Sequence, residues 1–149
     1  MRLVLSLAVL ATATFTAATA EAAVSNGTFT GKTTAKDPIG LTVGAGSRIT
    51  SLHYDSVHMT CTDEDKYDMR RTEVTGAKFR IRSGGKWTAK VSTRGGASTW
   101  TATGRFNAKG TRSTGTLTIN QRFNVENELD PEGPIRCESG KVKFTVTRR

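Results

Sequence analysis

Hydrophobic and polar residues alternate most regularly along the segment from Trp100 to Val125. A period of two is typical of a strand with one buried and one exposed face. Between the two arms, Ala108 to Gly110 ends in a glycine, which adopts a positive φ without strain. We therefore predict a β-hairpin in which Phe106 and Leu117 point into the core. Its inward positions are Trp100, Ala102, Gly104 and Phe106 in the first arm and Gly115, Leu117, Ile119, Phe123 and Val125 in the second, interrupted by Gln121.

Shorter alternating runs predict further strands. Val24 to Lys32, Ile39 to Val43 and Val142 to Val146 each predict one strand. Between Arg48 and Cys61 the hydrophobic positions change phase twice. Such a change predicts a bulge or bend on each side of Leu52 to Tyr54.

Two other segments carry weaker patterns. Thr62 to Thr75 is highly charged and has little periodicity, which predicts a long loop. The apolar runs Phe79 to Ile81 and Lys86 to Val91 flank Ser83-Gly84-Gly85. These turn residues predict a second compact hairpin.

The fold class follows from these patterns. No apolar period of 3.6 appears after residue 22, and threonine, which favours strands, is frequent throughout. Seven to nine short strands joined by glycine-rich turns predict an all-β fold with minimal helix. The spacing suits either an antiparallel β-sandwich or a β-barrel.

The first 22 residues are organised as a secretory signal peptide. Arg2 precedes an uncharged run from Leu3 to Ala20, and small residues precede cuts after Ala20 or Ala22. The run is short and interrupted by serine and threonine, which disfavours a transmembrane anchor. We expect residues 1–22 to be removed. Residues 23–149 then form a single all-β domain that is secreted or otherwise extracytoplasmic, in the periplasm or cell envelope.

The chain is strongly basic, with 22 Lys and Arg against 13 Asp and Glu and a net charge of +9. Loss of Arg2 and Glu21 with the signal peptide leaves this balance unchanged. Such a charge favours anionic cell-envelope polymers as partners. Because the charges are scattered along the sequence, general attraction is favoured over a dedicated anion site. No nucleic-acid-binding module is recognisable, so we expect no nucleic-acid partner.

Cys61 and Cys137 are the two cysteines of the chain. Outside the reducing cytosol they predict a disulfide bond. By restricting the unfolded chain, this bond would contribute about 4 kcal/mol to stability. A metal pair or a catalytic thiol is the alternative, but neither cysteine has a second cysteine or histidine at ligand spacing.

Acidic residues cluster after Cys61 and before Cys137, and a disulfide would draw the two clusters together. Hard cations such as Ca²⁺ prefer carboxylate oxygens. The EF-hand spacing is missing, and solvated loops are often acidic. We therefore assign no metal and expect no cofactor. The candidates for a cation site are Asp63, Asp65, Glu128 and Asp130.

Catalytic groups are sparse in this sequence. His53 and His58 lie five positions apart, which would place them on opposite faces of one regular strand, although the predicted bulge or bend between them can change this. No G-x-S-x-G motif supplies an activated serine. The large aromatic residues Tyr54, Trp87 and Trp100 alternate with polar residues, so we expect them in the core rather than on a sugar-binding surface. No catalytic residue is assigned.

Five segments of the chain form a recognisable set: Gly27 to Thr33, Ile49 to Leu52, Gly104 to Phe106, Gly115 to Leu117 and Cys137 to Val142. Together these segments resemble a group of small secreted bacterial β-domains of actinobacterial type that lack an assigned activity. The resemblance spans most of the chain after residue 22. It implies a fold but no catalytic residues, and the acidic loop after Cys61 departs from the pattern.

We therefore expect an exported, non-enzymatic β-domain that acts in binding or in association with the cell envelope. A small-ligand carrier or an inhibitor built on a closed β-barrel is the alternative, and a hydrolase ranks third. An apolar cavity would favour the carrier, and a constrained loop near the disulfide would favour the inhibitor.

Overall fold

A computed structural model describes residues 24–62, 66–93, 96–123 and 134–149. The predicted signal peptide and Val125 lie outside these ranges. Apart from a 3-10 turn at Ser83–Gly85, the described residues form strands, turns and irregular segments. The all-β prediction is confirmed. The strands are β1 (Gly27–Thr33), β2 (Pro38–Gly44), β3 (Arg48–Cys61), β4 (Lys66–Arg80), β5 (Lys86–Ser92), β6 (Ser98–Phe106), β7 (Arg112–Phe123), β8 (Ile135–Glu138) and β9 (Val142–Arg148).

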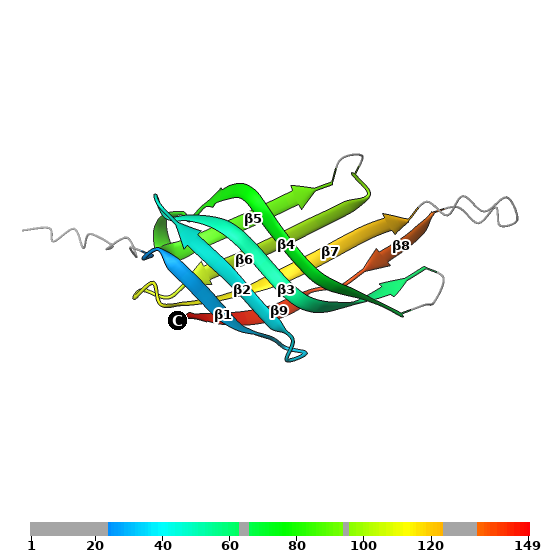
Figure 1. Cartoon of the computed structure of the whole chain (residues 1–149), viewed down its shortest axis with the longest axis horizontal. Coiled ribbons are helices and arrows are strands. Elements are labelled where there is room, and N and C mark those ends of the chain that lie inside the picture. The colour runs from blue at the N-terminus through cyan, green and yellow to red at the C-terminus, as the bar shows by residue number, and fades with distance from the viewer. Residues whose placement is uncertain (1–23, 63–65, 94–95, 124–133) are drawn as a thin grey trace, which may run out of the picture.

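All strand pairs recorded for the described residues are antiparallel and form one sheet in the order β4-β3-β2-β1-β9-β7-β6-β5. In Figure 1, β2, β3 and β4 cross in front of β5, β6 and β7, while β1 and β9 join the two halves along the lower side. The short strand β8 pairs with both β3 and β7. The sheet is therefore curved into a partial ring that faces itself across a core, and it is not a closed barrel.

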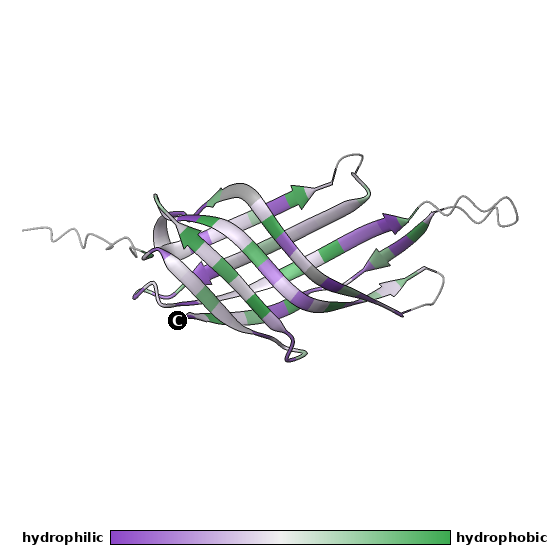
Figure 2. Cartoon of the chain, viewed as in Figure 1, coloured by the Kyte–Doolittle hydropathy of each residue, from purple (hydrophilic) through white to green (hydrophobic). Residues whose placement is uncertain are grey.

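The core lies inside this partial ring. The predicted hairpin is confirmed as β6 and β7, with Phe106 and Leu117 only 3% and 0% exposed. Tyr54 and Trp87 are also buried, as expected, and Trp100 is partly buried. Figure 2 shows hydrophobic and hydrophilic residues alternating along the strands, as expected for a sheet with one buried face. Other buried members are Phe29, Ile39, Leu41, Val43, Ile49, Val57, Met59, Ile119, Phe144 and Val146.

The predicted loop at Thr62 to Thr75 is wrong, because most of this segment belongs to the long strand β4. This strand pairs with β3 from Thr60↔Lys66 to Arg48↔Arg80. Charged side chains such as Asp68 and Glu73 obscured its periodicity, yet they are exposed, as is common on the edge strand of a sheet.

The predicted second hairpin at Ser83 to Gly85 is also wrong. No ladder joins β4 to β5 in the described residues, because these strands are the two edges of the curved sheet. The turn instead connects the two edge strands of the partial ring. Just before it, Ile81 N donates a hydrogen bond to Ser47 O at 2.9 Å. The true partner of β5 is β6.

The two predicted irregularities in β3 have different origins. Near Thr50 the pairing with both β2 and β4 shifts register, which is a β-bulge. Between Tyr54 and Val57 the buried face changes without a shift, since Tyr54↔Thr72 and Val57↔Met69 keep one register. The second irregularity is therefore a bend shared by β3 and β4.

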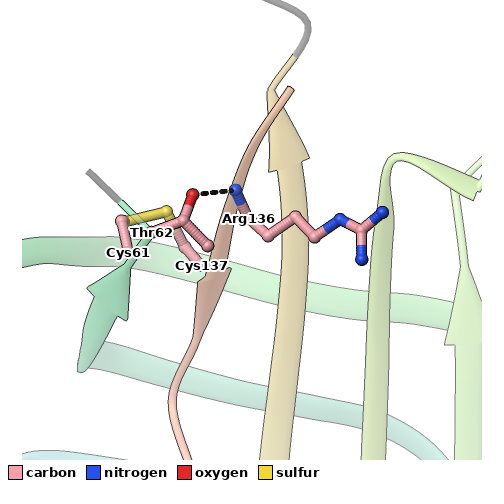
Figure 3. The surroundings of a disulfide bond; sticks show 4 residues. All are labelled: Cys61, Thr62, Arg136 and Cys137. Carbon is pink, nitrogen blue, oxygen red and sulfur yellow. Dashed lines mark hydrogen bonds between the residues drawn. A yellow bond between two sulfur atoms is a disulfide. The ribbon is translucent and has the colours of Figure 1, made fainter. Parts of the chain in front are cut away.

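The Cys61–Cys137 disulfide forms as predicted. Both cysteines are buried and lie directly opposite each other on β3 and β8. Next to them, Arg136 N donates to Thr62 Oγ1 at 3.2 Å (Figure 3). Thr62 N in turn donates to Arg136 O at 2.9 Å. The disulfide thus fastens β8 to the end of β3.

Candidate functional site

The outward residues of β5, β6, β7, β9 and β1 form a surface that we call the basic face. Cross-strand register aligns residues that are far apart in the sequence. One row runs Lys86, Arg105, Thr114, Thr145, Lys32, and the next runs Thr88, Thr103, Thr116, Lys143. Neighbouring strands lie about 4.8 Å apart, so the first row spans roughly 19 Å across five strands. Cations thus alternate with threonine hydroxyls over a continuous surface.

The charge on this face has a single sign. The five strands β1, β5, β6, β7 and β9 contain no aspartate or glutamate. Glu138 of β8 lies opposite Asn120, near the end of β7 away from Thr114. Among the described residues none of the cations on this face takes part in an ion pair, so they leave a positive potential over the five strands. The exposed cations on the outward positions are Lys32, Lys86, Lys90, Arg105, Arg112, Arg122 and Lys143.

A groove of about 530 Å³ runs along β9 on this face. Its cations are Lys32 and Lys143, and its hydroxyls come from threonines on β1, β7 and β9 and in the turn after β1. The opposed pair Gly115 and Phe144 completes the lining between the two rows. The lining threonines are Thr33, Thr34, Thr114, Thr116 and Thr145.

A second groove of about 290 Å³ adjoins the first at Thr114, which lines both. Its cations are Arg105 and Arg112, from the two strands of the central hairpin. Arg105 is held in place by a hydrogen bond from Nε to the carbonyl oxygen of Gly84 at 3.1 Å. Asn107 shapes the hairpin turn by accepting from Thr111 N and Arg112 N at 2.9 and 3.2 Å. The two grooves are thus neighbours that share Thr114, and both are open to solvent.

The scattered-charge interpretation of the sequence is therefore incomplete, because the fold gathers these cations on one side. No local run of lysine or arginine reveals the face. The strand order brings the cations together, because β9, β7 and β6 lie between β1 and β5 in the sheet. A count of acidic residues in each predicted strand was the signal that could have indicated it.

The two histidines both lie on the outer side of β3, whereas a regular strand would place them on opposite faces. The bend between Tyr54 and Val57 accounts for the difference, since both of these residues point inward. His58 Nδ1 lies 2.8 Å from Asp68 Oδ1 on the neighbouring strand, and both side chains are about half exposed. His53 lies over Gly40, whose missing side chain makes room for the imidazole ring.

These histidines do not form a hydrolytic site with a serine. In the described ranges no serine hydroxyl is hydrogen-bonded to either ring, and Ser51 Oγ donates instead to Glu73 Oε1 at 2.8 Å. An exposed histidine–carboxylate pair lacks the nucleophile and the dry surroundings that acyl transfer requires. The pair is a surface contact between β3 and β4.

The cation-site candidates Asp63, Asp65, Glu128 and Asp130 lie outside the described residues. Within those residues, no group of three or more His, Cys, Asp or Glu side chains could hold a metal ion. Nor does any described helix have the length and apolar character needed to cross a membrane.

Tyr54 is a titratable side chain that lies buried in the core. Its hydroxyl accepts a hydrogen bond from Trp100 Nε1 at 2.8 Å and donates to Met69 Sδ at 3.0 Å. Burial raises the pKa of Tyr54, and the hydrogen bonds of its hydroxyl to Thr72 and Trp100 oppose this only in part. The tyrosine is therefore kept neutral in the core, where it ties β3 to β6.

Comparison with known proteins adds no family to this picture: no protein-family model matches the chain, and no curated protein matches it significantly.

Proposed function

We propose that this protein is an exported, non-enzymatic β-domain that binds anionic polymers of the cell envelope through its basic face. The observation that carries the proposal is the arrangement of cations on five adjacent strands without one carboxylate among them. A surface of one sign attracts a polyanion over roughly a Debye length, about 8 Å at physiological ionic strength. Scattered surface charge of mixed sign would not do this.

Export is part of the same proposal. The disulfide favours an extracytoplasmic location, since such bonds are rare in the cytosol. The signal-peptide pattern of residues 1–22 and the resemblance to small secreted bacterial β-domains point the same way. A location in the envelope would place the basic face among phosphate-rich and carboxylate-rich polymers.

The carrier and the hydrolase have less support. A carrier needs an enclosed apolar cavity, whereas both grooves of the basic face are open to solvent and have lysine or arginine side chains in their lining. The sheet is a partial ring rather than a closed barrel. Its inward residues pack on one another as a core. The His58–Asp68 pair lies exposed, and in the described chain no serine hydroxyl is hydrogen-bonded to the His58 ring.

The test is retention of the disulfide-bonded protein, without residues 1–22, on immobilised anionic envelope material across a salt series. A charge-reducing pair on the face, Lys90→Gln with Lys143→Gln, is compared with a matched pair elsewhere. Arg48→Gln with Arg80→Gln removes the same charge from cross-strand partners on β3 and β4.

We expect the face variant to elute at clearly lower salt than the wild type, and the control variant to elute near it. In 1 M salt, where the Debye length is about 3 Å, the difference should vanish. If both variants eluted at equally lowered salt, the loss of net charge alone would explain the weaker binding, and the basic face would have no special role. Retention that ignores salt, or turnover of ester, peptide or glycoside substrates that is abolished at His58, would overturn the proposal.

A further inference from the structure

The groove along β9 differs from the rest of the basic face in its chemistry. Among the described residues that line it, the two cations are the lysines Lys32 and Lys143, and none is an arginine. Between them lie threonine hydroxyls, including the cross-strand pair Thr114 and Thr145. The groove therefore offers ammonium groups and hydroxyls that approach from three strands.

This donor set fits one class of anion better than another. A carboxylate is planar and is matched best by the planar fork of an arginine. A phosphodiester is tetrahedral, and its oxygens accept from lysine ammonium groups and small hydroxyls that approach from different directions. Lysine acts as a point charge toward phosphate and requires no coplanar geometry.

The shape of the site indicates a chain rather than a single phosphate. The groove along β9 adjoins the groove of Arg105 and Arg112 at Thr114, and neither groove is enclosed. Lys32 and Arg105 belong to the same cross-strand row, three strands apart, which is roughly 14 Å. A polymer crossing the strands along this row would meet a cation, two threonines and a second cation in turn.

We infer that the groove along β9 is a phosphodiester subsite, and that the preferred ligand is a polyol-phosphate or sugar-phosphate polymer rather than a polycarboxylate. This inference rests on the proposed function and narrows its ligand class. The lysines supply attraction, and the hydroxyls of Thr114 and Thr145 supply the selectivity for phosphate.

The test measures binding of the disulfide-bonded protein to three soluble probes of matched charge per chain at physiological salt. The probes are poly(glycerol phosphate), poly-L-glutamate and oligothymidylate. The decisive variant is Thr114→Val with Thr145→Val, which removes both hydroxyls, retains the β-branched shape and leaves every charge in place.

Its matched control is Thr28→Val with Thr42→Val, a cross-strand threonine pair on β1 and β2 outside both grooves. We expect wild type and control to bind poly(glycerol phosphate) about tenfold more tightly than poly-L-glutamate, a difference of about 1.4 kcal/mol. The groove variant should lose most of that preference while its affinity for poly-L-glutamate stays nearly unchanged. Thermal unfolding of both variants checks that each remains folded.

The outcomes separate this inference from the proposed function. Equal affinity for the phosphate and carboxylate polymers, weakened alike by Lys32→Gln with Lys143→Gln, would overturn the phosphate subsite and leave the binding of polyanions intact. Tighter binding of oligothymidylate than of poly(glycerol phosphate) would overturn it in favour of nucleic acid. Absence of binding to all three probes would overturn both proposals.

Discussion

The indole ring of Trp87 packs over Gly104, the residue directly opposite it on the neighbouring strand. A Cβ atom at Gly104 would lie 2.6 Å from Cε2 and Cζ2 of the ring, closer than atoms can approach. The next residue in the same row is Gly115, which is covered in the same way by the ring of Phe144. Two opposed glycines thus make room for two aromatic rings in the core.

This relationship predicts that Gly104→Ala destabilises the domain by about 1 to 3 kcal/mol, since the added methyl group forces a tightly packed ring to move. Gly115→Ala should cost at least as much, because the carbonyl oxygen of Thr103 is also in the way. Urea denaturation measures both. Thr103→Ala, on the exposed side of the same hairpin, is the control. A neutral Gly104→Ala would mean that the ring does not lie where the structure places it.

The second prediction concerns the inward face of the central hairpin. Phe106→Ala or Leu117→Ala should lower the free energy of unfolding by roughly 2 to 5 kcal/mol, because each removes a buried side chain and leaves a cavity. Since the free energy of unfolding of small domains is about 5 to 15 kcal/mol, either change would remove a large part of the stability of this domain. Thr103→Ala and Thr118→Ala on the other face should cost far less. Equal costs on the two faces would contradict the observed burial.

A strand of this fold could be predicted from the sequence where one of its sides faces the core along its whole length, because its residues then alternate between hydrophobic and polar. The hairpin of β6 and β7 alternates cleanly because one side faces the core along its length, so Phe106 and Leu117 could be assigned from sequence alone. In β4 the alternation is broken by a bend and by exposed charges along a free edge. Sequence periodicity carries little information in such a strand.

The candidate site was hidden for a different reason. Lys32 and Arg105 belong to one cross-strand row because β9 and β7 pair with each other between their two strands. Local sequence reports the turn residues and the face of each strand, but it does not report which strands become neighbours. For the same reason Ser83 to Gly85 resembled a hairpin turn, although β4 and β5 do not pair.

The third prediction concerns the disulfide. Titration of the denatured, unreduced protein with a thiol reagent should detect no free thiol, because both cysteines are bonded. Reduction should lower the free energy of unfolding by about 4 kcal/mol, since the bond closes a loop of 76 residues in the unfolded chain. A variant with both Cys61→Ala and Cys137→Ala controls for other effects of the reductant. Two free thiols per unreduced chain would contradict the bond.

The fourth prediction follows from the raised pKa of Tyr54. The unfolded chain releases the tyrosine proton near pH 10, whereas the folded protein holds it to higher pH because burial disfavours the phenolate. The stabilisation from the neutral buried hydroxyl is therefore fully present below about pH 10, and it is lost as pH rises from there through the folded-state pKa. Stability, measured by urea denaturation, should fall steeply in this alkaline range.

Tyr54→Phe separates this titration from that of the lysines. The substitution removes the acceptor of the Trp100 indole N–H, so it should lower stability at neutral pH by about 1 to 3 kcal/mol. Because phenylalanine has no proton to lose, the further decline above pH 10 should be shallower than in the wild type. Tyr67→Phe is the matched control, since Tyr67 is 54% exposed and its replacement should leave the alkaline decline unchanged. If Tyr54→Phe and the wild type lost stability in parallel above pH 10, the decline would belong to the lysines, and Tyr54 would not be the group held neutral in the core.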